Sequence, residues 1–495
     1  MTWRKDATGE THYAYDTLSR EIFRSLQDDS EATLTYTPAG DLDTYTDPMG
    51  TTHYTYDDAG RLESLKDPAG RTTTYTYNNN DKRTHTTYPG NTVQKVTLDK
   101  DGKPTAIKAT NGSTTLVDLA YTYTTGTGDP GTKIYTRTDQ AADRKTAYTY
   151  DSAGRLSYAK ETNTTSGTRT ASWLYCFDKA GNLTHQDTTA TTCPTSPTYA
   201  YDDASQLTSK SGSTTGWSYD TAGNETAATP AGGTARTGES WSDYNQLTSI
   251  TTSGTTYQAK HAGTTNDERT KLGDTWFHHT QLGLASTTTG PTDTGFVREP
   301  GGTLNSMTRS GKSYYYLTDA TGNVLGAVDQ TGTRTHAYTP TGTPRTTPTE
   351  TAPQPYRFAG AYSDPTGLYK MGARYYDPAL GRFTQPDPSG QETNTYLYAE
   401  GDPINRTDPQ GTLSFDSIGN SLGIGTILYA GFTGGTGAAE SATASMIADV
   451  GITALCEVGA AAFTGPGAVP ALPFCMAIGA AAGMYVGATY QNNLN

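Results

Sequence analysis

Asp-Pro dipeptides are the feature of this sequence best suited to carry chemistry. Two carboxyl groups held close together share one proton, because like charges in contact cannot both ionise, and such a pair acts as base and acid toward an attacking water. An Asp-Pro pair is also a common turn, in which Asp accepts a local N–H and Pro fixes φ. The dipeptide alone is therefore unspecific. It occurs at Asp47, Asp67, Asp129, Asp364, Asp377, Asp387, Asp402 and Asp408.

Other patterns that match known active sites are weak. His278 and His279 are adjacent, so on a strand their side chains point to opposite faces and are poorly placed to share a metal ion. Residues 419–423 match Gly-x-Ser-x-Gly around Ser421, but no strand–turn–helix context surrounds it. Residues 126–131 match Gly-x-Gly-x-x-Gly, yet their Asp-Pro indicates a turn and no helix follows. The sequence therefore predicts no metal and no cofactor.

Aromatic residues recur along the chain at a nearly fixed interval. Tyr15, Tyr36, Tyr56 and Tyr77 are separated by 21, 20 and 21 residues. Three of them follow another tyrosine two positions earlier, and residues at i and i+2 lie on one face of a strand. The spacing predicts β-strands that carry a pair of rings on one face.

A turn follows each ring pair, as in Tyr-Asp-Asp-Ala-Gly-Arg-Leu at residues 56–62. Asp57 is expected to accept a backbone N–H two residues on, Gly60 to supply a positive φ, and Leu62 to return to the apolar face. One such hairpin has roughly 20 residues and is too small to bury its own face, so neighbouring hairpins must stack. We interpret the Tyr and Asp residues as scaffold, with a sugar-binding stripe of tyrosines as the alternative. Copies of the unit begin at Tyr150, Phe177, Tyr201, Tyr219 and, in degenerate form, Trp241.

The composition agrees with an all-β chain. Hydrophobic residues are only 33% of the 495, but 35 Tyr, 10 Phe and 5 Trp argue against disorder, because disordered chains are poor in aromatic residues. The net charge of −14, with no basic stripe, argues against nucleic acid as the main partner. The four cysteines make no disulfide framework. Cys176 with Cys193, and Cys456 with Cys475, could pair or remain as buried thiols.

Residues 314–411 hold an ordered set of motifs. They include Tyr-Arg-Phe-Ala-Gly at 356–360, Ala-Arg-Tyr-Tyr-Asp-Pro at 373–378, Gly-Arg-Phe-Thr-Gln-Pro-Asp-Pro at 381–388 and Asp-Pro-Gln-Gly at 408–411. With the Tyr-Asp-x-x-Gly-Arg-Leu units, this set resembles the YD repeats and repeat-associated core of bacterial Rhs proteins, of the C components of insecticidal Tc toxins, of wall-associated Rhs proteins and of animal teneurins.

The resemblance implies an all-β fold in which YD-repeat hairpins wind as a spiral shell around a hollow interior, with the core sealing one end. It divides the chain into a YD shell (1–310), a repeat-associated core (311–411) and a variable C-terminal tail (412–495). The N-terminus has no apolar signal segment and begins in the rhythm of the repeats, so we expect the C-terminal part of a longer, secreted or surface-delivered protein.

Some members of the family cut themselves at the end of the core with an aspartic-protease-like pair, at the motif Pro-x-x-x-x-Asp-Pro-x-Gly-Leu. Pro403 begins this motif here, and Thr412 stands where Leu is expected, with Leu413 one step later. The resemblance implies Asp387 and Asp408 as the carboxylate pair. It implies Arg382 as an orienting or charge-balancing residue, and a scissile bond after Thr412 or Leu413. Asp377 and Asp402 are interpreted as turns.

The tail differs sharply in composition from the repeats. Ala471 to Thr489 contain no charged side chain, and Gly479, Gly483 and Gly487 recur every four residues, as in closely packed helices. A second apolar run covers residues 446–463. The tail is expected to be mainly α-helical, either a membrane-inserting helical hairpin, or a small helical bundle or linker.

The leading prediction is a shell that encapsulates the tail as cargo, delivers it, and possibly releases it by self-cleavage. Further partners implied are the carbohydrate or membrane of a target cell and an immunity protein. The alternative is a cell-surface binding module for carbohydrate or a neighbouring cell, without catalysis. A decayed fragment without either activity is a third interpretation.

Overall fold

The computed structural model describes residues 2–6, 8–26, 30–123, 131–329, 336–345, 352–390, 392–412 and 414–416. Within these residues the first 17 strands form one antiparallel sheet in which each strand pairs with the strand before and after it in the chain. These strands are β1 (Trp3–Asp6), β2 (Gly9–Tyr15), β3 (Glu21–Ser25), β4 (Glu31–Tyr36), β5 (Leu42–Asp47), β6 (Gly50–Tyr56), β7 (Leu62–Lys66), β8 (Thr72–Tyr77), β9 (Arg83–Tyr88), β10 (Thr92–Leu98), β11 (Pro104–Asn111), β12 (Thr114–Thr122), β13 (Thr136–Asp139), β14 (Arg144–Tyr150), β15 (Leu156–Asn163), β16 (Arg169–Phe177) and β17 (Leu183–Asp187).

Two short hairpins continue this wall, and a second antiparallel meander follows them. The hairpins are β18 (Tyr199–Tyr201) with β19 (Leu207–Lys210), and β20 (Ser218–Tyr219) with β21 (Glu225–Ala227). The meander comprises β22 (Arg236–Trp241), β23 (Leu247–Thr252), β24 (Thr255–His261), β25 (Arg269–Leu272), β26 (Thr275–Thr280), β27 (Gly283–Thr289), β28 (Thr292–Arg298), β29 (Leu304–Arg309), β30 (Lys312–Thr318) and β31 (Val324–Val328). The predicted border between shell and core, at residues 310 and 311, falls in the turn between β29 and β30.

The turn at residues 56–62 explains how one hairpin holds the next. The Asp57 carboxylate accepts the N–H groups of Ala59 and Arg61, each at 3.0 Å, and Gly60 has a φ of +76°. Arg61 pairs with Asp57 at 2.6 Å and lies 4.7 Å from the ring centre of Tyr77 in the following repeat. The roles predicted for the Asp and the Gly are therefore confirmed.

The second ring of each pair also fastens neighbouring hairpins. The Tyr77 hydroxyl donates to the Leu62 carbonyl at 2.7 Å, and the Tyr56 hydroxyl makes the same bond to Leu42. The hydroxyl of Tyr36 donates to the carbonyl of Glu21 at 2.8 Å. These contacts are internal to the wall and support the scaffold interpretation of the repeats.

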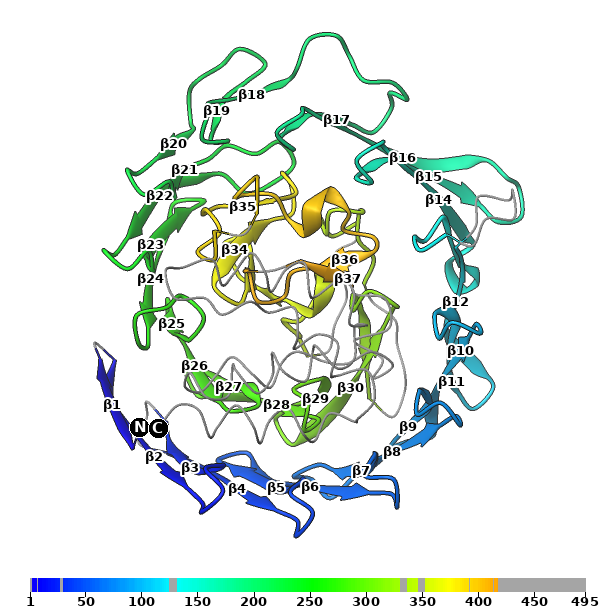
Figure 1. Cartoon of the computed structure of the whole chain (residues 1–495), viewed down its shortest axis with the longest axis vertical. Coiled ribbons are helices and arrows are strands. Elements are labelled where there is room, and N and C mark those ends of the chain that lie inside the picture. The colour runs from blue at the N-terminus through cyan, green and yellow to red at the C-terminus, as the bar shows by residue number, and fades with distance from the viewer. Residues whose placement is uncertain are drawn as a thin grey trace, which may run out of the picture.

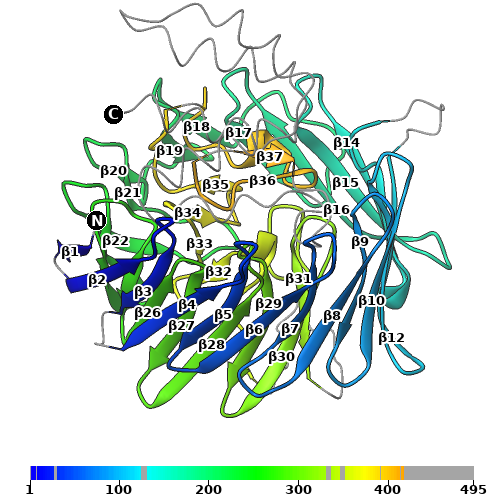
Figure 2. The ribbon, with the colours of Figure 1, turned by 60° about the horizontal axis from the view of Figure 1, so that its bottom comes forward.

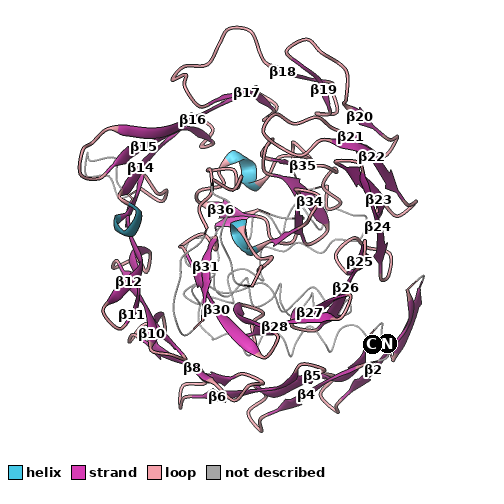
Figure 3. Ribbon diagram, turned by 180° about the vertical axis from the view of Figure 1, so that it is seen from behind, coloured by secondary structure: helices cyan, strands magenta, loops and turns pink. Residues whose placement is uncertain are grey.

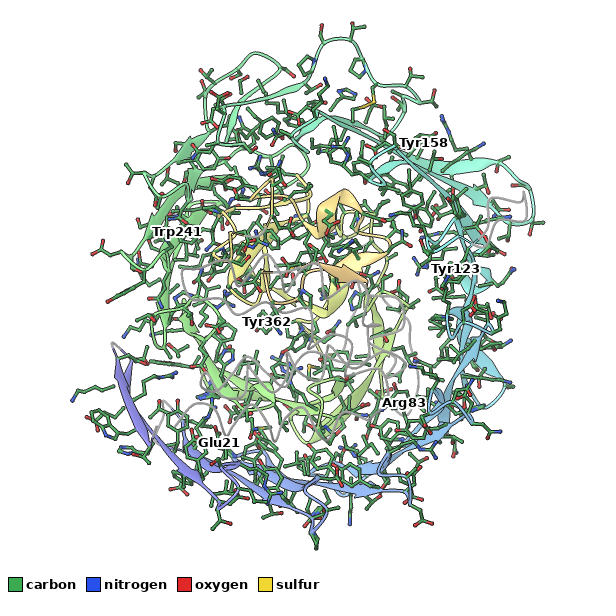
Figure 4. The ribbon with its side chains drawn as sticks, in the orientation of Figure 1. Glu21, Arg83, Tyr123, Tyr158, Trp241 and Tyr362 are labelled. Atoms are coloured by element: carbon green, nitrogen blue, oxygen red, sulfur yellow. A yellow bond between two sulfur atoms is a disulfide. The ribbon has the colours of Figure 1, made fainter. Side chains whose placement is uncertain are left out.

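Figure 1 shows the strands as a ring, with β26 to β30 lying inside the wall strands β2 to β9. Figure 2, turned by 60°, shows the outer strands β3 to β7 in front of the inner strands β26 to β30. Buried ion pairs and hydrogen bonds join them: Arg83 pairs with Glu299 at 2.7 Å, and the Tyr54 hydroxyl donates to the Arg298 carbonyl at 2.7 Å (Figure 4, where Arg83 is labelled). The wall is thus double on this side.

The N-terminal strand closes the ring against the loop between β24 and β25. The Asp6 carboxylate accepts the N–H of Gly263 at 2.8 Å, and Arg4 pairs with Glu268 at 2.8 Å. These residues are more than 250 positions apart in the chain, so the contact fixes the circumference of the ring.

The described residues after β31 lie in the interior of the ring (Figures 1 and 3). Their strands are β32 (Tyr362–Ser363), β33 (Tyr369–Met371), β34 (Arg374–Asp377), β35 (Arg382–Phe383), β36 (Arg406–Thr407) and β37 (Phe415–Asp416). The 3-10 turns are η1 (Gln140–Ala142) in the wall, and η2 (Phe358–Gly360) and η3 (Ala399–Gly401) in this core. Phe358, Tyr369, Tyr376, Phe383 and Tyr398 pack as one aromatic cluster that fixes the core's turns relative to one another.

The predicted all-β spiral shell is confirmed. Cys176 and Cys193 form a disulfide, with their Cα atoms 5.9 Å apart, which settles one of the two open cysteine pairs. Among the described residues no helix has the length and apolar character needed to span a bilayer. Of the tail predicted at residues 412–495, the structure describes residues 412 and 414–416, which include the short strand β37. Its remainder, with Cys456 and Cys475 and the predicted helices, lies outside the described residues.

Candidate self-cleavage site

Two Asp-Pro-x-Gly turns at the end of the core bring carboxyl groups to the junction with the tail. The first follows β35 and contains Asp387; the second follows β36 and contains Asp408. In each turn the Gly N–H donates to the Asp carbonyl at 3.3 Å, for Gly390 and for Gly411. The local bonds expected of an Asp-Pro turn are present in both, and the carboxyl groups make additional contacts.

Asp408 is fully buried and contacts the junction directly. Its Oδ2 pairs with Nη2 of Arg374 at 2.7 Å, and its Oδ1 accepts the N–H of Thr412 at 3.0 Å. Arg374 belongs to β34, donates to the Thr395 carbonyl at 2.9 Å and lies 3.6 Å from the ring centre of Phe383. The guanidinium is therefore fixed on several sides while it balances the Asp408 carboxylate.

Asp387 reaches the same residue through Ser389. Its Oδ1 accepts the Ser389 N–H at 2.9 Å, and its Oδ2 lies 2.6 Å from the Ser389 hydroxyl. That hydroxyl lies 3.0 Å from the carbonyl oxygen of Thr412. Asp408 thus contacts the N–H of residue 412, while the Asp387–Ser389 pair contacts its C=O.

The chain is also held just beyond the junction. The Ser414 hydroxyl donates to Oε1 of Glu392 at 2.8 Å, and Arg406 donates to the Ser414 carbonyl at 3.0 Å. β36 and β37 pair antiparallel over Arg406–Asp416 and Thr407–Phe415. Leu413, named as an alternative cleavage position, lies outside the described residues, but the chain is anchored on both sides of it.

Gly411 is required by the close approach of the second turn to the core. Its φ is +64°, and a Cβ there would overlap the Met371 carbonyl oxygen and lie 2.8 Å from the Arg374 nitrogen. The Ala373 N–H donates to the Gln410 carbonyl at 2.8 Å across the same contact. This backbone contact sets the distance between the turn and Arg374.

The electrostatics of the site are dominated by burial. Burial lowers the pKa of the Arg374 guanidinium below its ordinary value, although the carboxylates of Asp408 and Asp387 act in the opposite direction. Burial also raises the pKa of Glu392 above its ordinary value. Among the described residues, the site brings the guanidinium groups of Arg374 and Arg406 and the carboxyl groups of Asp387, Asp408 and Glu392 around a single segment of backbone.

Arg382 lies elsewhere in the core. Its guanidinium donates to the Ser205 carbonyl at 2.7 Å and stacks on Tyr396 and Tyr201, with ring centres at 4.4 and 5.2 Å. It fastens the core to the hairpin at β18 and β19. The arginine that contacts Asp408 is Arg374, which the sequence reasoning missed because both arginines precede an aromatic residue in neighbouring motifs.

The other aspartates of the core have structural partners. Asp377 accepts the Ala379 N–H at 2.8 Å and pairs with Arg236 at 2.9 Å. Asp402 accepts two bonds of 2.9 Å from the Asn405 amide and pairs with Lys133. Across the part of the chain that is described, no cluster of His, Cys, Asp and Glu could hold a metal ion.

Comparison with known proteins agrees with this architecture. The family model of the teneurin YD-shell matches residues 290–404, and that of the RHS repeat matches 36–72, 59–93 and 201–235. The chain contains RHS repeats and a teneurin-type YD-shell segment. The YD-shell match covers the inner strands β28 to β31 and most of the core, and it ends shortly before Asp408.

Relatives and solved structures extend the likeness. The tRNA3(Ser)-specific nuclease WapA of Bacillus spizizenii is 36% identical over 121 residues, which is 22% of this chain and 5% of that protein. The double-stranded DNA deaminase toxin A of Burkholderia cenocepacia is 31% identical over 153 residues, 27% of this chain and 11% of that one. A crystal structure of TcdB2-TccC3-TEV has a TM-score of 0.65 and 18% identity, over 83% of this chain and 24% of that one. This YD-repeat chain thus corresponds to a small part of much longer proteins.

Proposed function

We propose that this chain is the shell of a toxin-delivery protein that cuts its own backbone after Thr412 and keeps the separated C-terminal segment as cargo. The observation that carries the proposal is the convergence of two aspartates on one residue. Asp408 accepts the N–H of Thr412, and Asp387 is linked through Ser389 to its carbonyl oxygen. The peptide bond between Thr412 and Leu413 is therefore the one that lies beside the contacts from the two turns.

The reaction is hydrolysis in which one carboxyl group acts as the base and the other as the acid. Asp408, paired with Arg374, enters as the carboxylate and takes a proton from the attacking water. Asp387 enters protonated and supplies the proton that the Thr412 carbonyl oxygen gains as the water oxygen bonds to its carbon. The C–N bond then breaks as the proton on Asp408 passes to the departing nitrogen of Leu413, and the proton gained by the carbonyl oxygen returns to Asp387, which restores both carboxyl groups to their starting states.

The substitution of Thr for Leu at position 412 is compatible with this chemistry. Both contacts from the turns are made to backbone atoms of Thr412, so they do not depend on its side chain. Gly411, by contrast, is fixed by its contact with Met371 and Arg374. Cleavage in this chain is therefore expected to depend on the Asp-Pro-x-Gly frame more than on the residue that follows it.

Retention of the product follows from the anchors beyond the junction. After cleavage the β36–β37 pairing and the bonds from Glu392 and Arg406 to Ser414 would still hold the new end inside the ring. Relatives with matching repeats carry names such as tRNA nuclease, deaminase toxin and toxin subunit, which supports a toxic cargo. For this function, the shell would have to be delivered out of the producing cell and to bind the surface of a target cell. An immunity protein would protect the producing cell from the cargo.

Asparagine variants at the two aspartates test the proposal. Purified wild-type chain is expected to separate under denaturing conditions into two fragments, whereas Asp387→Asn and Asp408→Asn remain whole. Asp57→Asn is the matched control, because it makes the same change in a repeat turn far along the wall and should cleave like wild type. Wild-type chain that stays whole, or either core variant that still cleaves, would contradict the proposal.

A further inference from the structure

Ser389 lies between the Asp387 carboxyl group and the backbone of Thr412. It lies in the first Asp-Pro-x-Gly turn, exposed at its surface, and its hydroxyl approaches both Oδ2 of Asp387 at 2.6 Å and the Thr412 carbonyl oxygen at 3.0 Å. The corresponding residue of the second turn, Gln410, contacts the core through its backbone carbonyl instead. Asp408 touches Thr412 with no intermediary.

The count of protons at Ser389 limits how these contacts are made. A hydroxyl has one proton and can donate it to only one acceptor at a time. The Thr412 carbonyl oxygen has no proton, so a hydrogen bond there uses the proton of Ser389. The short contact with Asp387 is then a hydrogen bond only if the proton belongs to the Asp387 carboxyl group, which donates it to the Ser389 oxygen.

We propose that Ser389 is a catalytic residue that relays the proton of Asp387 to the Thr412 carbonyl oxygen. The inference rests on the self-cleavage proposed above and adds the path by which the acid acts. The arrangement is a chain of two hydrogen bonds, from carboxyl to hydroxyl and from hydroxyl to carbonyl. No direct contact between the Asp387 carboxyl group and the carbonyl oxygen is needed.

The step balances without any further reactant. As the water oxygen bonds to the Thr412 carbon, Asp408 accepts a proton from that water. At the same time the Ser389 proton moves to the carbonyl oxygen, and the Asp387 proton replaces it on Ser389. When the C–N bond breaks and the carbonyl re-forms, the relay runs backward, and Asp387 regains its proton while Leu413 nitrogen takes the one held by Asp408.

Backbone geometry holds the relay in place. The Ser389 N–H donates to Oδ1 of Asp387 at 2.9 Å, so the carboxyl group grips the residue at both its N–H and its hydroxyl. The Asp387 N–H donates to the Thr395 carbonyl at 2.8 Å, which ties the turn to the core. The hydroxyl is therefore held facing Thr412 by contacts within the core.

The test compares full-length chains made by cell-free synthesis with a labelled amino acid, followed by a chase and a denaturing gel. General acid catalysis typically contributes about 100-fold or more, so Ser389→Ala is expected to cleave about 100-fold more slowly than wild type. Ser389→Thr keeps the hydroxyl and is expected to cleave at close to the wild-type rate. Because Ser389 is exposed, both variants should unfold at the wild-type temperature.

Each contrary result has a distinct meaning. A wild-type chain that never cleaves removes the proposed function and the relay together. Wild type and Ser389→Ala cleaving at equal rates overturns the relay and leaves the two aspartates in place. Equal loss of cleavage in the Ala and Thr variants also overturns it, because the hydroxyl would then not be the group that matters.

Discussion

A cluster of one arginine and three carboxyl groups joins the shell wall to the core. Protonation of its carboxyl groups should change the free energy of unfolding of the chain. Arg236 lies 2.5 Å from Glu225, 3.3 Å from Glu239 and 2.9 Å from Asp377 of β34. All four side chains are buried. One cation cannot neutralise three carboxylates, so the cluster favours a bound proton.

The sign of the pH dependence follows from Glu239. Burial, together with the nearby Glu225 carboxyl group, raises the pKa of Glu239 well above its ordinary value of 4.5. A carboxyl group whose pKa is raised by folding contributes stability that is complete below pH 4.5 and is lost as the pH rises toward the folded value. For one proton the free energy of unfolding falls by at most about 1.4 kcal/mol per pH unit in that window.

Glu239→Gln removes the titrating group without changing its size. We expect the difference in free energy of unfolding, variant minus wild type, to rise with pH above 4.5 by up to about 1.4 kcal/mol per unit. Taking this difference cancels contributions of opposite sign, such as that of Lys370, whose pKa burial lowers to about 7.

The measurement is urea unfolding followed by tryptophan fluorescence from pH 5 to pH 9. Glu63→Gln, at an exposed position of β7, is the matched control and should give a difference that does not change with pH. If the free energy of unfolding changed with pH by the same amount in Glu239→Gln and in wild type, the reasoning would be refuted, because the buried proton would then not be bound by Glu239.

Three further perturbations test other parts of the fold. Arg83→Met leaves Glu299 buried without its cation and should cost about 3–5 kcal/mol in urea unfolding, with partial recovery in the double variant Arg83→Met/Glu299→Met; equal loss in both would contradict a paired contact. Gly411→Ala should abolish cleavage on a denaturing gel, whereas Gly60→Ala, with open space around it, should cost only about 1–2 kcal/mol and still cleave. Cys193→Ser opens the disulfide and should destabilise the chain by about 3 kcal/mol, seen as a lower thermal midpoint that a reductant lowers no further.

The repeat turn was predictable because its causes are local. Asp57 accepts N–H groups within four residues of itself, and the positive φ of Gly60 is a property of the turn. The role of the arginine in the turn was not predicted. Arg61 stacks on Tyr77 of the next repeat, which explains why Arg, ring and Asp recur together, but seeing it requires the register between hairpins.

Contacts between distant segments could not be derived from the sequence. Arg83 and Glu299 meet across two layers, and neither residue belongs to a motif that indicates the other. The same holds for Arg374, whose contact with Asp408 depends on the backbone packing of Gly411 against the core. The family resemblance of the motifs indicated the two aspartates of the proposed pair. Arg374, the cation that pairs with Asp408, could be identified only from the three-dimensional structure.

Cleavage after Thr412 with retention of the product can be tested by mass spectrometry of one preparation of full-length protein, first under native and then under denaturing conditions. We expect a native mass equal to the whole chain and two denatured masses, one ending at Thr412 and one beginning at Leu413. A single uncleaved polypeptide under both conditions would show that the chain does not cut itself.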